Sequence, residues 1–112
     1  FISLTKVLTA LTGLLAEGGE IIALVKPQFE AGREQVGKKG VVRSARTHQE
    51  VLAKVMAAGR EAGLACQGVT YSPVLGPEGN IEFLMYWRKG EAPEPAIDLA
   101  QVVEAAWADL KN

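Results

Sequence analysis

Lys26 and Glu82 are the two side chains in this sequence best placed to move a proton. Lys26 follows the apolar run from Ile21 to Val25, and Glu82 lies near the start of a second apolar segment. Open α/β sheets place their sites where buried strands end. A lysine acts as a base only when neutral, which burial or a second cation favours, whereas a nearby carboxylate orients the amine and opposes its deprotonation. The alternatives are a lysine that extends from the sheet edge into solvent and a solvated edge glutamate.

A second group of charged residues is cationic and lies between residues 33 and 46. Within this stretch Glu34 is the single acidic residue, and the glycines Gly37 and Gly40, with Gly32 just before the stretch, leave the backbone free to approach a phosphate. The basic residues are Arg33, Lys38, Lys39, Arg43 and Arg46. Such a patch suits phosphate contacts, which supply affinity and position RNA without reading its sequence. The stretch therefore predicts an RNA-binding loop, and a solvated charged loop is the alternative.

Four other side chains could do chemistry, but their patterns are weaker. Phe29 could stack on a displaced base or belong to the core. We expect His48 to be a surface or helix-capping residue and Cys66 to be a small core residue. Trp107 lies in an apolar helical stripe, which predicts a core or subunit contact. A single cysteine excludes an internal disulfide, and with one histidine far away it disfavours a zinc site.

The composition limits the class of protein. With 112 residues, 48% of them hydrophobic, the chain has room for one small domain. A net charge of -1 excludes a uniformly basic nucleic-acid coat, so binding to RNA would need a local patch. The longest apolar run is too short to span a bilayer, and the sequence resembles no secretory signal. We therefore expect a protein of the reducing cytoplasm with no membrane partner.

Hydrophobic spacing predicts the elements that position these residues. Ile21–Val25 is apolar without alternation, which indicates a strand buried on both faces. Thr47 and Glu50 match a capping box, which predicts the start of a helix. The expected elements are a helix from 4 to 15, strands at 21–25, 64–72 and 81–87, a loop from 29 to 46, a helix from 47 to Gly63 and a helix from 99 to 110.

This order of elements predicts an α/β fold with a mixed sheet. The first two strands would be joined by a right-handed crossover, and the final strand would be reversed. Helices are expected on both faces of the sheet. A reversed last strand is the usual end of Rossmann-like methyltransferases. Because the chain opens at Phe1 without a methionine, we expect a fragment of a longer protein.

Four stretches of the sequence resemble the TlyA branch of the FtsJ-like RNA methyltransferases. They are Phe1-Ile2-Ser3-Leu4, Ala23-Leu24-Val25-Lys26-Pro27-Gln28-Phe29-Glu30, the string from Gly32 to Arg43, and Gly76-Pro77-Glu78-Gly79-Asn80-Ile81-Glu82-Phe83. The resemblance covers residues 1 to about 86. It implies that residues 1–112 form the C-terminal part of one Rossmann-like domain dependent on S-adenosylmethionine. The donor-binding half and an N-terminal RNA-binding domain would then lie outside this chain, so the fragment alone is expected to be inactive.

The resemblance also implies roles for two residues. In this family a Lys-Asp-Lys-Glu tetrad surrounds the target ribose hydroxyl, and its last two members match Lys26 and Glu82. The other lysine and the aspartate would lie before Phe1. The implied substrate is ribosomal RNA, alone or in ribosomal subunits, methylated at the ribose 2′-oxygen of cytidines. A noncatalytic RNA-binding module and a membrane-active haemolysin are the alternatives, and the sequence contains no basic amphipathic helix for the latter.

Overall fold

A computed structural model describes residues 3–111, with the exception of the Lys38 side chain; Phe1 and Ile2 lie outside this range. The strands are β1 (Glu20–Val25), β2 (Leu64–Tyr71) and β3 (Phe83–Lys89). The helices are α1 (Leu4–Leu14), α2 (Pro27–Glu30), α3 (Ala45–Glu61) and α4 (Leu99–Leu110), with short 3₁₀ turns η1 (Arg33–Gln35), η2 (Lys38–Gly40) and η3 (Pro77–Gly79). The predicted strands and long helices are therefore present, with small shifts at their ends.

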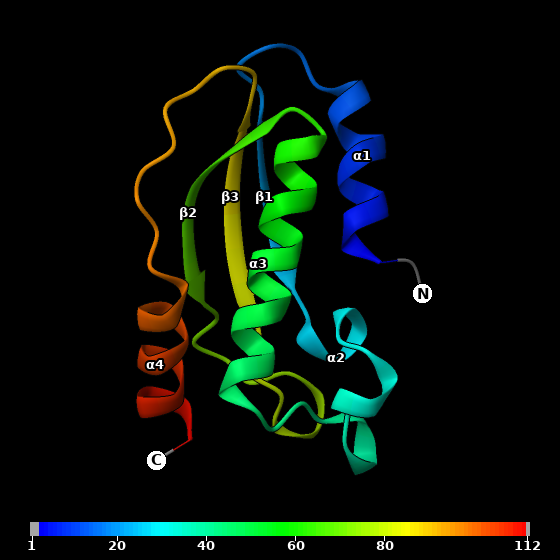
Figure 1. Ribbon diagram of the computed structural model, residues 1–112, viewed down its shortest axis with the longest axis vertical. Helices are drawn as coiled ribbons and strands as arrows, with labels where there is room; N and C mark the ends of the chain where they lie inside the picture. The colour runs from blue at the N-terminus through cyan, green and yellow to red at the C-terminus, as the bar shows by residue number, and fades with distance from the viewer. Residues whose placement is uncertain (1–2, 112) are drawn as a thin grey trace.

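The three strands form one sheet in the order β1-β3-β2, and β3 is antiparallel to both neighbours. β1 and β2 consequently run in the same direction, with the reversed last strand between them (Figure 1). The reversed final strand is thus confirmed. The sheet of the described residues is antiparallel at both pairings instead of mixed, because β3 inserts between the two strands that run the same way.

Residues alternate between a covered and an open face of the sheet. Phe83, Met85 and Trp87 are fully buried, whereas Ile22 is 72% and Leu24 is 41% exposed. α1, α3 and α4 share one hydrophobic core on the covered side (Figure 1). The expectations of a strand buried on both faces and of helices on both faces are therefore not met within residues 3–111, since these residues place their long helices on one side.

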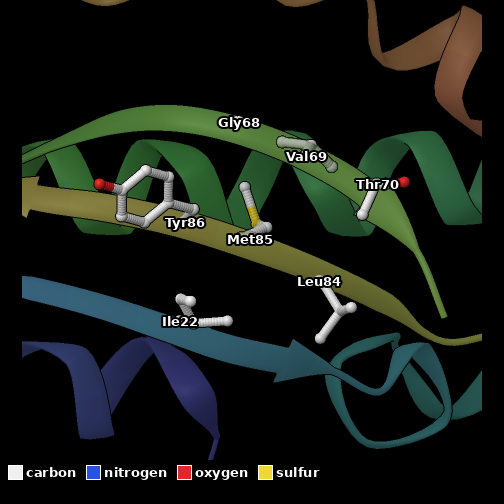
Figure 2. Close-up of a pocket in the computed structure, with 7 residues that line it drawn as sticks. All are labelled: Ile22, Gly68, Val69, Thr70, Leu84, Met85 and Tyr86. Atoms are coloured by element: carbon white, nitrogen blue, oxygen red, sulfur yellow. The ribbon is translucent and has the colours of Figure 1, made fainter.

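The open face carries a shallow apolar hollow of about 380 Å³. Figure 2 shows Ile22, Leu84 and Tyr86 on neighbouring strands along this hollow, with α3 behind the sheet. Gly68 and Thr70 of β2 complete its border. This hollow contains no charged side chain, so it does not contribute to the polar site described below.

α3 differs from its predicted form at the start. Its N-cap is Ser44, whose side chain accepts a hydrogen bond from the Thr47 amide, so the helix begins before the predicted capping box. Consequently His48 lies inside the helix and is fully buried, which corrects its expected surface or capping position. The helix ends before Gly63, whose φ of +92° confirms the predicted left-handed cap.

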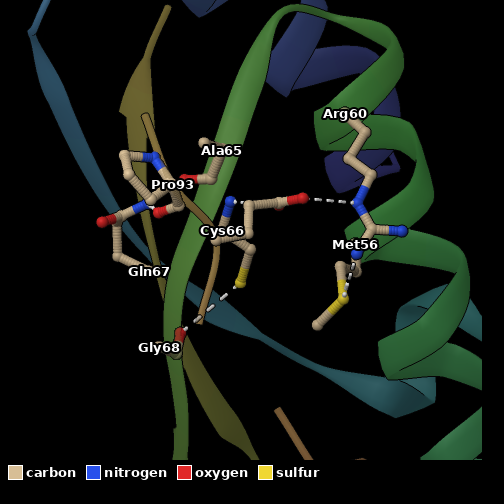
Figure 3. A network of polar contacts seen from close by, with 8 residues as sticks. Met56, Arg60, Ala65, Cys66, Gln67, Gly68 and Pro93 are labelled. Atoms are coloured by element: carbon tan, nitrogen blue, oxygen red, sulfur yellow. Dashed lines mark hydrogen bonds and ion pairs between the residues drawn. The ribbon is translucent and has the colours of Figure 1, made fainter. Parts of the chain in front are cut away.

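The outer edge of β2 is fastened by the segment that precedes α4. Glu94 accepts hydrogen bonds from the Cys66 amide at 2.7 Å and from Arg60 at 3.0 Å. Gln67 donates a hydrogen bond to the Pro93 carbonyl (Figure 3). Burial raises the pKa of the Cys66 thiol, as expected for a core cysteine. In the described part of the chain, no helix is long and apolar enough to cross a membrane.

Candidate functional site

The structure brings Lys26 and Glu82 together at one end of the sheet. Val25 and Phe83 are paired across β1 and β3, so Lys26, just after β1, lies beside Glu82, just before β3. The Lys26 Nζ atom is 3.7 Å from Glu82 Oε2. The lysine side chain is 38% exposed and that of the glutamate 6%. A largely buried carboxylate thus holds an amine that still reaches solvent, where an incoming substrate could meet it.

Gln28 is a third member of this site that the sequence did not single out. Its Nε2 atom donates a hydrogen bond to Glu82 Oε2 at 2.9 Å. Its Oε1 atom is buried and has no hydrogen-bond partner among the described residues. Lys26 and Gln28 flank Pro27, which begins α2, so one sharp turn directs both side chains at the same carboxylate. In the sequence, the single indication of this contact is that Gln28 lies two residues after Lys26.

Gly76 closes the site from the other side. A Cβ atom added at Gly76 would lie well inside van der Waals contact of the Glu82 carboxylate. The φ of Gly76 is −81°, a value open to any residue, so the backbone itself does not require glycine. The requirement for glycine comes from the close approach of the carboxylate.

The turn that carries Lys26 and Gln28 is anchored by Glu30. The Glu30 carboxylate is buried and accepts hydrogen bonds from Ser3 Oγ at 2.7 Å and from the Leu4 amide at 2.8 Å. Lys54 of α3 donates a hydrogen bond to the Glu30 carbonyl at 2.7 Å. These contacts tie α2 to the start of α1 and to α3, which restricts the movement of the site.

The predicted basic loop is more ordered than its sequence indicates. Arg33 lies in η1, and Arg43 is exposed in the extended segment before α3. Lys39 is exposed and adopts a φ of +66°, a left-handed conformation that is uncommon outside glycine. Arg46 belongs to the first turn of α3, where it lies 3.6 Å from Glu50. The Lys38 side chain is outside the described part of the structure.

Asn80 joins this basic segment to the turn that precedes Glu82. Its side chain accepts a hydrogen bond from the Val42 amide at 3.0 Å and donates to the carbonyls of Gly40 at 2.9 Å and Pro77 at 3.0 Å. Asn80 itself is buried. In Figure 1 the segment from α2 to α3 and the connection from β2 to β3 accordingly lie together below the sheet.

A hollow of about 340 Å³ lies beside the site and is lined by Gln28, Phe29, Arg33 and their neighbours. Phe29 is 43% exposed, so it is not a core residue. Trp107 is half-buried and donates a hydrogen bond from Nε1 to His48 Nδ1 at 3.0 Å, which gives it the expected packing role. His48 and Trp107 thus belong to the helical layer and not to the Lys26 site.

The sequence of this chain is similar to those of known methyltransferases. The sequence model of the FtsJ-like methyltransferase family matches residues 1–89. YqxC of Bacillus subtilis, named as a proposed rRNA methyltransferase, is 46% identical over 118 residues, which include all of this chain and 42% of YqxC. The 16S/23S rRNA (cytidine-2′-O)-methyltransferase TlyA of Mycobacterium tuberculosis is 42% identical over 88 residues, which are 79% of this chain and 33% of TlyA.

Solved structures share the fold of this chain. A proposed hemolysin from Streptococcus thermophilus superposes with a TM-score of 0.92 at 43% sequence identity, covering 98% of this chain and 40% of that one. A second, from Lactococcus lactis, gives a TM-score of 0.86 at 40% identity and covers 93% of this chain and 50% of the other. The chain therefore spans half or less of the length of these four proteins.

Proposed function

Because this chain belongs to the FtsJ-like methyltransferase family, we propose that it supplies the acceptor side of an RNA ribose 2′-O-methyltransferase, with Lys26 as the general base. The observation that carries the proposal is the 3.7 Å approach of Lys26 Nζ to the buried Glu82 carboxylate at the end of β1. A ribose hydroxyl is a weak nucleophile, and sharing its proton with a positioned base makes its oxygen reactive. The exposed amine is the group that an incoming ribose would meet.

The proposed step moves one proton. The ribose 2′-hydroxyl donates it to the neutral Lys26 amine, which becomes an ammonium, while the ribose oxygen forms its bond to the transferred methyl carbon. The bond from that carbon to the donor's sulfonium sulfur would break at the same time, and the electron pair would leave with the sulfur as a neutral thioether. The Glu82 carboxylate orients the amine before the step and stabilises the ammonium after it. Glu82 thereby acts through Lys26 and does not need to touch the ribose.

We propose S-adenosylmethionine as the methyl donor, since it supplies an electrophilic methyl group. Residues 3–111 do not fit it as a complete site: β1 is followed directly by Lys26 and Pro27, not by a glycine-rich turn opening a helix. We therefore assign no residue of this chain to the donor. An isolated chain of this length is proposed to be inactive.

The proposed substrate is ribosomal RNA, alone or in ribosomal subunits, with cytidine as the target nucleotide, as in the name of the TlyA relative. Arg33, Lys39 and Arg43 are exposed, and the Asn80 contacts hold their segment to the turn before Glu82. A cationic segment beside the reactive amine suits a phosphate backbone. Lys38 and Arg46 are proposed to add to the same patch, and the protein is proposed to act in the cytoplasm.

The decisive experiment replaces Lys26 by methionine in the longest natural protein that contains these 112 residues. Methionine keeps the length and the apolar stem but removes the amine, so single-turnover methyl transfer should fall by about 10²- to 10⁴-fold. Lys26→Arg should fail as well, because a guanidinium stays charged. Glu82→Gln should lose less activity than Lys26→Met. Near-normal rates for Lys26→Met would make Lys26 a structural residue and the general-base assignment wrong. A parent protein that binds RNA but transfers no methyl group would favour the noncatalytic RNA-binding module.

A further inference from the structure

We propose that Gln28 is a positioning residue of this site: its amide fixes the Glu82 carboxylate, and through it the Lys26 amine. This proposal rests on the methyltransferase function proposed above. Gln28 Nε2 lies 2.9 Å from Glu82 Oε2, whereas Lys26 Nζ lies 3.7 Å from the same oxygen. The hydrogen bond from the amide is thus the shorter of these two polar contacts.

The orientation of the Gln28 side chain supports a role beyond packing. With Nε2 directed at Glu82, the Oε1 atom is buried and has no hydrogen-bond partner among residues 3–111. A buried carbonyl oxygen without a partner is unfavourable, because it has lost its hydrogen bonds to water. The opposite orientation would place Oε1 against a carboxylate oxygen, where two acceptors repel. The structure therefore leaves Oε1 without a partner while Nε2 donates to Glu82. Buried polar atoms without partners are uncommon in native structures, and a functional role is one explanation for them.

Gly76 completes the positioning of the carboxylate. Its missing side chain leaves the space that Glu82 occupies, since a Cβ atom there would overlap the carboxylate. Gln28 thus holds Oε2 from one side, while the Gly76 backbone limits movement on the other. A carboxylate restricted in this way keeps its charge beside Lys26 in one place, which preorganises the amine for its proton.

The test compares Gln28→Leu and Gln28→Glu in the longest natural protein that contains this chain. Leucine has a similar size but donates no hydrogen bond, so the single-turnover rate should fall by about tenfold or more, in the range for lost preorganised contacts. The Kd values for RNA and for the methyl donor should stay within about twofold of the parent values. Gln67→Leu is the matched control, because it removes a glutamine hydrogen bond at the far β2 edge (Figure 3) and should leave the rate unchanged.

Gln28→Glu adds a readout that a purely structural role would not change. At high pH two carboxylates would repel each other beside Lys26 and displace the Glu82 carboxylate, so the variant should be slower than Gln28→Leu. As the pH falls, the carboxyl pair takes up a shared proton and a donor to Glu82 is restored. The rate ratio of Gln28→Glu to Gln28→Leu should therefore rise with falling pH.

A second variant guards against misfolding at position 28. Gly76→Ala should displace the Glu82 carboxylate and lower the rate in the same way, while the allowed φ of −81° leaves the backbone unstrained. An unchanged rate for Gln28→Leu alongside an inactive Lys26→Met would overturn the Gln28 proposal alone. A flat rate ratio, or losses of binding or stability as large as the loss of rate, would overturn it too. Full activity of Lys26→Met would remove both proposals.

Discussion

The Asn80 side chain accepts a hydrogen bond at 3.0 Å from the backbone amide of Val42, 38 positions earlier in the chain. Asn80→Ala would leave this amide unpaired in a buried position, together with two carbonyls that lose their donors. An unsatisfied buried group costs about 1–3 kcal/mol, and the free energy of unfolding should fall by at least that amount. Urea denaturation measures the change.

The control for this variant is Gln101→Ala, an exposed position on α4 where alanine suits the helix. It should leave stability within about 0.5 kcal/mol of the parent. If Asn80→Ala were equally neutral, the basic segment would not depend on this contact. Proteolysis should also reveal the difference, since the segment from Lys39 to Arg43 would open more often without the contact.

A pair of glycine substitutions tests the packing of the helices. Gly13 of α1 has open space around its Cβ position, so Gly13→Ala should stabilise the protein by about 0.5–1 kcal/mol. A Cβ atom at Gly59 of α3 would lie 2.8 Å from Trp87 Nε1, so Gly59→Ala should destabilise it by about 1–3 kcal/mol. Thermal unfolding of both variants gives the comparison. Equal effects would show that α3 can move away from β3 without loss.

The site around Lys26 and Glu82 shows what the sequence could and could not predict. The positions of Lys26 and Glu82 at strand ends were predictable because each lies beside an apolar strand, and strand ends are a local signal. That Glu82 belongs with Lys26 was implied by the family resemblance and not by the local pattern. The Gln28–Glu82 contact spans 54 positions and depends on β3 lying next to β1, which no local pattern encodes. The same limit applies to Asn80, whose partners belong to another segment.

Burial was predicted less well than the elements. The run Ile21–Val25 contains no polar residue, so its composition did not reveal that Ile22 and Leu24 point to an open face. His48 was mistaken for a surface residue because the capping box at Thr47 competes with an equally good cap at Ser44. Because α3 begins at the earlier cap, it is about one turn longer than predicted, and the imidazole of His48 contacts Phe83 and Trp107.

His48 should make stability depend on pH. Burial, followed by the charge of Lys111, lowers the pKa of His48 from 6.5 to about 4. Trp107 Nε1–H donates to Nδ1, so protonating that nitrogen would also break a hydrogen bond. Because the pKa is lower in the folded state, the unfolded chain takes up the proton first as the pH falls. Stability should therefore be lost between about pH 6.5 and 4, by up to about 3 kcal/mol.

The pKa of His48 can be measured directly by NMR, because His48 is the single histidine of the chain. The imidazole proton resonance should titrate near pH 4 in the folded protein and near 6.5 in urea. The free energy of unfolding should be lower at pH 5 than at pH 7. A folded-state midpoint near 6.5 would mean that the imidazole is solvated and that its helix packs differently.

The last prediction concerns the basic segment in the longest natural protein that contains this chain. Replacing Lys38 by Gln, Lys39 by Asn and Arg43 by Gln removes three charges, and asparagine tolerates the left-handed backbone at position 39. Each lost phosphate contact removes released counterions, so the slope of log K against log salt should decrease by about 0.7–0.9 per contact. Donor affinity should stay unchanged. Filter binding at several salt concentrations measures the slope.

The matched control is Arg88→Gln, which removes one exposed positive charge at the opposite end of β3, where Arg88 is paired with Glu20 at 3.0 Å. If the slope reports a specific phosphate track, Arg88→Gln leaves it unchanged, because counterion release requires contact and not overall charge. An equal decrease of the slope in the triple variant and in Arg88→Gln would assign the effect to the overall charge of the protein and not to local phosphate contacts. An unchanged slope in the triple variant would make the segment a solvated loop, held beside Glu82 by Asn80 for structural reasons.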